Sequence, residues 1–62
     1  MVEAFDEVVG LGTVRGRDGR AYPFHCTQIA DGSRAIPAGA RAHFDVVAGL
    51  LGRWEAVALR LL

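Results

Sequence analysis

The chain has 62 residues and a mass of 6.6 kDa, which leaves room for one thin hydrophobic core. This length excludes a two-domain enzyme, a nucleotide-binding βαβ unit with a substrate domain, and a repeat array. Seven basic side chains, all of them arginine, balance seven Asp and Glu residues, so no net field attracts polyanions or membranes. We therefore expect a single domain over residues 1–62.

The cysteine content and the hydropathy pattern bear on the cellular compartment. The single cysteine, Cys26, has no partner for an internal disulfide, which argues against a disulfide-stapled secreted scaffold and favours a reducing cytosol. No apolar run approaches the roughly 18 to 20 residues that span a bilayer, and the N-terminus lacks a signal-peptide pattern. The sequence thus predicts a soluble cytoplasmic domain with no membrane partner.

Apolar residues alternate with polar ones along the chain instead of recurring every three or four positions, as in half-buried strands. Glycine-containing turns, including Asp18-Gly19, separate the alternating segments. In chain order, strands are expected at Val2–Phe5, Leu11–Arg15, Arg20–His25, Ala40–Val47 and Arg53–Leu61. One helical turn is expected at Cys26–Ile29.

The C-terminal segment also resembles a helix in composition, but it is short and follows Gly52, so an isolated helix is not favoured. Val57, Leu59 and Leu61 alternate there with Ala58 and Arg60, and we interpret the segment as a strand with these three side chains on one face. Five short strands in a chain of this size predict an all-β fold, a small five-stranded antiparallel barrel of the OB or SH3-like type.

Several segments resemble the cold-shock domain family. Residues 5–14, FDEVVGLGTV, resemble its first strand and first ribonucleoprotein motif, and residues 22–29, YPFHCTQI, resemble its second motif. Residues 39–46, GARAHFDV, resemble its fourth strand, and residues 49–56 its last hairpin. The resemblance covers nearly the whole chain and implies a five-stranded OB barrel that binds single-stranded RNA or DNA. It assigns core positions to Val14, Tyr22, Phe24, Ile29, Ile36, Phe44 and Val46.

The same resemblance places Leu11, Thr13, Arg15, Pro23 and His25 on the outer face of the second and third strands. Family members carry aromatic rings on this surface, whereas this chain has Ala4, Leu11, Thr13, Pro23, Cys26 and Ser33 at ring positions. Glu3 also replaces the usual lysine, while His25 is kept. Because each stacked base contributes about 1–3 kcal/mol, losing four or five rings removes about 5 kcal/mol or more of binding free energy.

Two functional hypotheses follow. In the first, the chain binds single-stranded nucleic acid weakly through Phe5, Leu11, Thr13, Arg15, His25 and Arg34. Two of these residues have alternative roles, since Phe5 also suits the core and His25 also suits an ordinary surface position. Arginines around the Asp18-Gly19 turn form either a basic rim or a solvated hairpin.

In the second hypothesis the barrel is a protein-interaction or dimerisation module, with a partner patch at Leu50, Leu51 and Trp54. Trp54 differs in parity from Val57, so it lies outside the core unless a bulge intervenes; alternatively, it packs across the end of the barrel. Cys26 and His25 are adjacent in the chain and do not form a metal site, since neighbouring side chains of a strand point to opposite faces. No catalytic set or phosphate loop is present, so neither enzyme activity nor a cofactor is expected.

Overall fold

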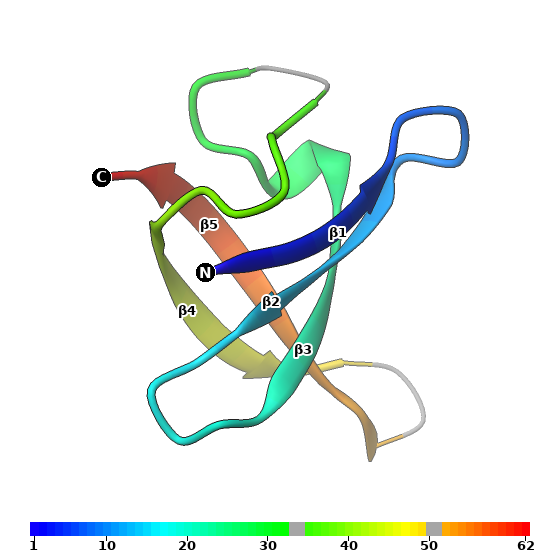
Figure 1. Ribbon diagram of the computed structural model, residues 1–62. Helices are drawn as coiled ribbons and strands as arrows, with labels where there is room; N and C mark the ends of the chain where they lie inside the picture. The colour runs from blue at the N-terminus through cyan, green and yellow to red at the C-terminus, as the bar shows by residue number, and fades with distance from the viewer. Residues whose placement is uncertain (33–34, 50–51) are drawn as a thin grey trace.

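The computed structural model describes residues 1–32, 35–49 and 52–62, which form two antiparallel sheets (Figure 1). The first sheet contains β1 (Val2–Asp6), β2 (Leu11–Arg15) and β3 (Ala21–His25) in that order. The second contains β4 (Ala42–Ala48) and β5 (Trp54–Leu61), and the 3₁₀ turn η1 (Cys26–Gln28) follows β3. The all-β prediction, the five strands and the helical turn are confirmed, with ends displaced by two residues at most.

The pairing of β2 with β3 runs without a bulge, so alternate side chains keep to opposite faces along the whole hairpin. Leu11 is opposite His25 and Thr13 is opposite Pro23 on the outer side. The hairpin closes through Gly19, whose φ of 80° is readily adopted only by glycine. An unshifted register explains why the alternation of this segment predicted its two faces correctly.

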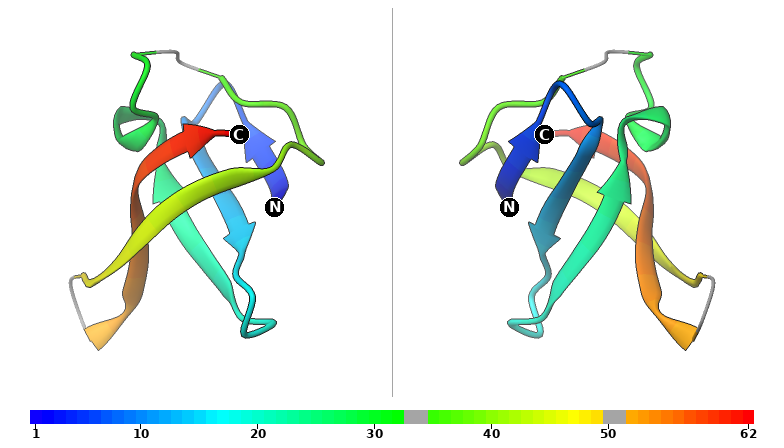
Figure 2. Two further views of the ribbon diagram at one scale, coloured as in Figure 1. Left: turned by 90° about the vertical axis from the view of Figure 1, so that its left-hand side faces the viewer. Right: turned by 90° about the vertical axis from the view of Figure 1, so that its right-hand side faces the viewer.

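The core lies between the two sheets. Its fully buried members are Val2, Val14, Phe24, Ile29, Ile36, Ala56 and Leu59, and Phe5, Tyr22 and Phe44 pack against them while partly exposed. Six of the seven predicted core positions therefore lie in or against the core. The prediction for Val46 is wrong, because its side chain is 39% exposed. The ends of the β4–β5 and β2–β3 hairpins diverge (Figure 2).

The two sheets do not close into the five-stranded barrel that we predicted. β5 lies beside β3, but the two strands do not form a ladder in the described residues. A single β-bridge joins this side of the fold, between Ile29, just after η1, and Leu59 of β5. At the other seam, Val2 hydrogen-bonds to Gly39 and Ala40, in the segment before β4, instead of to β4 itself. The exposed surface is 4359 Å², against about 3,900 Å² for an average compact protein of this mass.

A β-bulge interrupts the pairing of β4 with β5. His43 is opposite Arg60 and Asp45 is opposite Val57, so Ala58 and Leu59 together face the single residue Phe44. Ala58 has a φ of 54° there. The bulge changes the parity of β5, because Ala56 and Leu59, three residues apart, are both buried, so that Val57 and Leu59 do not share a face. Leu61, at the end of the strand, is 49% exposed. The predicted common face of Val57, Leu59 and Leu61 is therefore wrong, although Leu59 itself is in the core.

Candidate functional site

The register of β2 and β3 brings Leu11, Thr13, Pro23 and His25 together on one surface, which we call the outer face. Leu11 is 50% exposed, Pro23 and His25 are exposed, and Thr13 is half-buried. Four of the residues that the sequence singled out thus lie as cross-strand neighbours on the side of the sheet away from the core. Their role in binding stays a prediction.

Hydrogen bonds orient the imidazole of His25. The backbone N–H of Thr27 donates to Nδ1 of His25 over 3.3 Å, and the Thr27 hydroxyl lies 3.0 Å from the same atom. Because His25 caps η1 in this way, Nδ1 acts as an acceptor and the neutral ring carries its proton on Nε2. The outer face therefore presents a fixed aromatic ring with one N–H donor.

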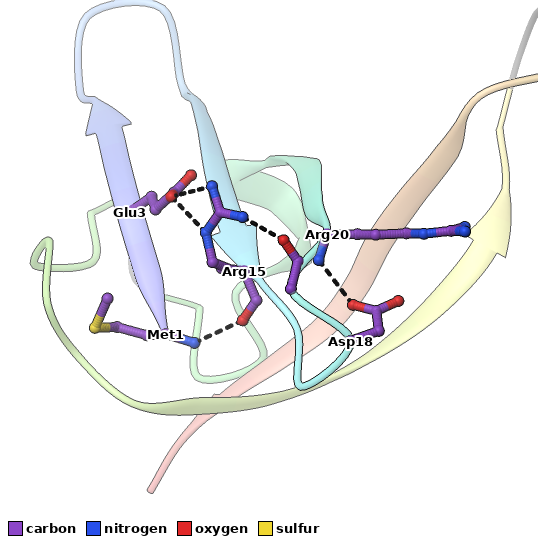
Figure 3. A network of polar contacts seen from close by, with 6 residues as sticks. Met1, Glu3, Arg15, Asp18 and Arg20 are labelled. Atoms are coloured by element: carbon purple, nitrogen blue, oxygen red, sulfur yellow. Dashed lines mark hydrogen bonds and ion pairs between the residues drawn. The ribbon is translucent and has the colours of Figure 1, made fainter.

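Arg15 continues the outer face toward the β2–β3 turn, but its charge is already paired (Figure 3). Its Nε and Nη2 atoms lie 2.7 and 2.6 Å from Oε1 of Glu3, and Nη1 donates to the carbonyl of Gly19. An exposed pair of this kind contributes little to stability, about 0–1 kcal/mol. Its main effect is electrostatic, since Glu3 neutralises the cation that the outer face offers to a phosphate.

The turn beside Arg15 is held by Asp18. Its carboxylate accepts hydrogen bonds from the Tyr22 hydroxyl at 2.6 Å and from the Arg20 backbone N–H at 3.0 Å, and Figure 3 draws the second. The hydrogen bond from Tyr22 lowers the pKa of the Asp18 carboxyl and raises the pKa of the Tyr22 hydroxyl. Asp18 is thus kept ionised as part of the turn.

Phe5, another residue predicted to bind, does not lie on the outer face. Phe5 is partly buried on the core side, where its ring stacks on Phe24 with centroids 5.7 Å apart and planes inclined by 12°. The core alternative for Phe5 is the one found. Arg34, Leu50 and Leu51 lie outside the described residues. Trp54 is 55% exposed at the start of β5, so it does not pack across the end of the sheets.

A groove of about 200 Å³ lies beside the outer face and involves residues that the sequence analysis missed. Leu11, Pro23 and His25 line one side, and Gln28, Glu55 and Val57 line the other. Oε1 of Gln28 accepts a hydrogen bond from the backbone N–H of Ala58 at 3.3 Å. The groove depends on β5 lying next to β3, a contact between sheets that no local pattern reveals. Its apolar walls suit the edge of a base, whereas Glu55 disfavours a phosphate there.

Comparisons of the chain with protein-family models, with curated proteins and with solved structures gave no match. Among residues 1–32, 35–49 and 52–62, no three His, Cys, Asp or Glu side chains come together in a group able to hold a metal ion. The same part of the chain contains no helix long and apolar enough to cross a membrane.

Proposed function

We propose that this chain is an OB-type module that binds single-stranded nucleic acid weakly through its outer face. The observation that carries the proposal is the side-by-side placement of Leu11, Thr13, Pro23 and His25 on β2 and β3. The corresponding strands form the binding surface of OB domains, which are themselves partly open five-stranded barrels. The sequence of neighbours supports this assignment: β1, β2 and β3 pair in order, β5 lies beside β3, and β4 pairs with β5.

The outer face suits a base better than a phosphate. A base stacks on the His25 ring and contacts Leu11 and Pro23, while the Nε2 proton of His25 is a donor for a base or backbone oxygen. Only one ring is present on this face in the described residues, and Arg15 is paired with Glu3. Weak affinity and a small dependence on salt follow from these two features.

The proposal predicts saturable binding of a fluorescently labelled oligo-dT or mixed-sequence RNA at low salt, with a Kd of about 0.1–1 mM. His25→Asn should weaken this binding about fivefold or more, because asparagine keeps an acceptor for the Thr27 N–H but removes the stacking ring. His43→Asn, at an exposed imidazole on β4, is the matched control and should leave the affinity for an oligonucleotide without a 5′-phosphate unchanged. Fluorescence anisotropy measures both.

Absence of saturable binding up to about 1 mM would contradict the proposal. Equal losses in the two histidine variants would also contradict it, since they would show that the imidazole of the outer face has no special role.

A second candidate function, self-association, is favoured by the apolar surface at the loop end of the β4–β5 hairpin. Val46 and Trp54, which we call the ribbon end, lie on the same face of the hairpin and are 39% and 55% exposed. A domain of this size without a disulfide gains stability from oligomerisation, and zero net charge does not oppose it.

If the ribbon end mediates association, sedimentation should show a concentration-dependent dimer in the range of about 0.1–1 mM, as for a weak interface. Trp54→Ser should weaken the dimer about tenfold, because the side chain would be covered on association. Val9→Ser is the control, since Val9 is 58% exposed in the β1–β2 turn. A monomer at all concentrations would exclude this second function.

A further inference from the structure

A cleft of about 480 Å³ lies where the two sheets fail to close. Its walls come from the β2–β3 turn on one side and from β4 on the other, two segments that diverge in Figure 2. The volume falls within the range of about 300–1,000 Å³ that is usual for small-molecule sites. Among the described residues that line the cleft, only Arg15 has its side chain on the outward side of β2 and β3. The cleft is therefore a different surface from the outer face.

Two aromatic rings form the apolar part of the cleft. Tyr22 and Phe44 lie with ring centroids 6.1 Å apart and planes inclined by 56°, and both rings are only partly buried. The hydroxyl of Tyr22 is held by Asp18 at 2.6 Å, which fixes the ring, and Val46 extends the apolar wall. Partly exposed rings in a fixed orientation suit a planar aromatic group of a ligand.

Cations from two different elements line the same cleft. Arg17 lies in the β2–β3 turn and Arg41 lies just before β4. Within the part of the chain that the structure describes, neither guanidinium forms an ion pair, whereas Arg15 is paired with Glu3. The one carboxylate side chain of the lining, Asp18, already accepts hydrogen bonds from Tyr22 and from the Arg20 backbone. Asp18 stays ionised, so its one negative charge is set against the two positive charges of Arg17 and Arg41, and the side chains that line the cleft keep a net positive charge.

We propose that this cleft binds a nucleotide phosphate, with the base against Tyr22 and Phe44 and the phosphate held by Arg17 and Arg41. Planar guanidinium groups match the oxygens of a phosphate in paired hydrogen bonds, and rings of this kind accept a base by stacking. The same chemistry is offered by a free nucleoside monophosphate and by the 5′-phosphorylated end of an oligonucleotide. The proposal does not depend on binding at the outer face.

An amide chemical-shift titration with AMP tests the proposal. We expect shifts at Gly16, Arg17, Tyr22 and Phe44, with saturation in the millimolar range or below, and about tenfold weaker binding of adenosine, which lacks the phosphate. The double variant Arg17→Gln/Arg41→Gln should weaken AMP binding about tenfold or more. Arg53→Gln, at an exposed arginine outside the cleft, should bind AMP as the natural chain does.

Oligonucleotides with and without a 5′-phosphate distinguish the two sources of the ligand. If the phosphorylated end is the ligand, the cleft amides shift with the 5′-phosphorylated oligonucleotide but not with the unphosphorylated one, and the shifts are larger than with AMP. If the free nucleotide is the ligand, AMP saturates the shifts and neither oligonucleotide does. Adenosine binding as tightly as AMP, or an unchanged double variant, would overturn the proposal. Shifts confined to Leu11, Thr13 and His25 would also overturn it, while supporting the proposed function at the outer face.

Discussion

Leu59→Ala is expected to lower the free energy of unfolding by about 2–5 kcal/mol, whereas Leu61→Ala lowers it by less than about 0.5 kcal/mol. Leu59 is fully buried between the sheets, and Leu61, two residues later in the same strand, is 49% exposed. The difference arises from position along the strand, since Leu61 is the last residue of β5 and its side chain is not covered there. The same deletion of atoms thus leaves a cavity at one position and only solvent at the other.

Denaturant unfolding followed by circular dichroism measures both variants. At about 0.05–0.15 kcal/mol per residue, a chain of 62 residues has about 3–9 kcal/mol of stability, so Leu59→Ala is expected to unfold a large fraction of the molecules. Leu59→Val, with an expected loss of about 1 kcal/mol, keeps the test measurable if the alanine variant does not fold. Equal losses at Leu59 and Leu61 would contradict the burial of Leu59 between the sheets.

Gly12→Ala is expected to destabilise the fold by about 1–3 kcal/mol, because β2 has no room for a methyl group at this position. A Cβ at Gly12 would lie 2.5 Å from Cζ of Phe24 and 2.8 Å from the carbonyl oxygen of Ala4. The ring of Phe24 is fixed by its stacking on Phe5, and the carbonyl belongs to the paired backbone of β1, so neither moves freely. Thr13→Ala, on the outer face next to it, should change stability by less than about 0.5 kcal/mol.

A double-mutant cycle with Phe24→Leu identifies the cause of that loss. The smaller side chain removes the ring atoms nearest to Gly12, so the glycine substitution should destabilise the Phe24→Leu background less than the natural chain. Thermal unfolding of the four proteins gives the coupling. Equal losses in both backgrounds would show that Phe24 is not what excludes a side chain at Gly12.

The sequence predicted the strands well because each of them is encoded locally. The alternation of the β2–β3 segment and the Asp18-Gly19 turn specify a hairpin whose faces are not shifted by a bulge, so Phe24 and His25 were assigned to the correct sides. In β5 the same reasoning assigned Val57 and Leu59 to one face and failed, because the bulge between them adds one residue and leaves no signal in the hydropathy pattern. The prediction of a closed barrel also failed, because Val2 of β1 hydrogen-bonds to Gly39 and Ala40 and not to β4. No local hydropathy pattern indicates this pairing.

The candidate site could be predicted only where it lies within one hairpin. The outer face follows from the parity of β2 and β3, whereas the groove at Glu55 and the cleft at Arg41 require the placement of one sheet against the other. The pairing of Arg15 with Glu3 was also missed. β1 has an irregularity between Val2 and Ala4, which displaces Glu3 from a simple alternation.

The incomplete seam also determines how the molecule opens. Among the described residues, few backbone hydrogen bonds join the two halves of the fold: Val2 bonds to Gly39 and Ala40, and Ala30 bonds to Leu59. The strands within each hairpin are paired along most of their length. The β4–β5 hairpin can therefore separate transiently by giving up side-chain packing while its own amides remain bonded. Solvent then reaches the interior first at this boundary, and the amide protons at Val2 and at Ala30, which bonds to Leu59, exchange earlier than those in the middle of β2.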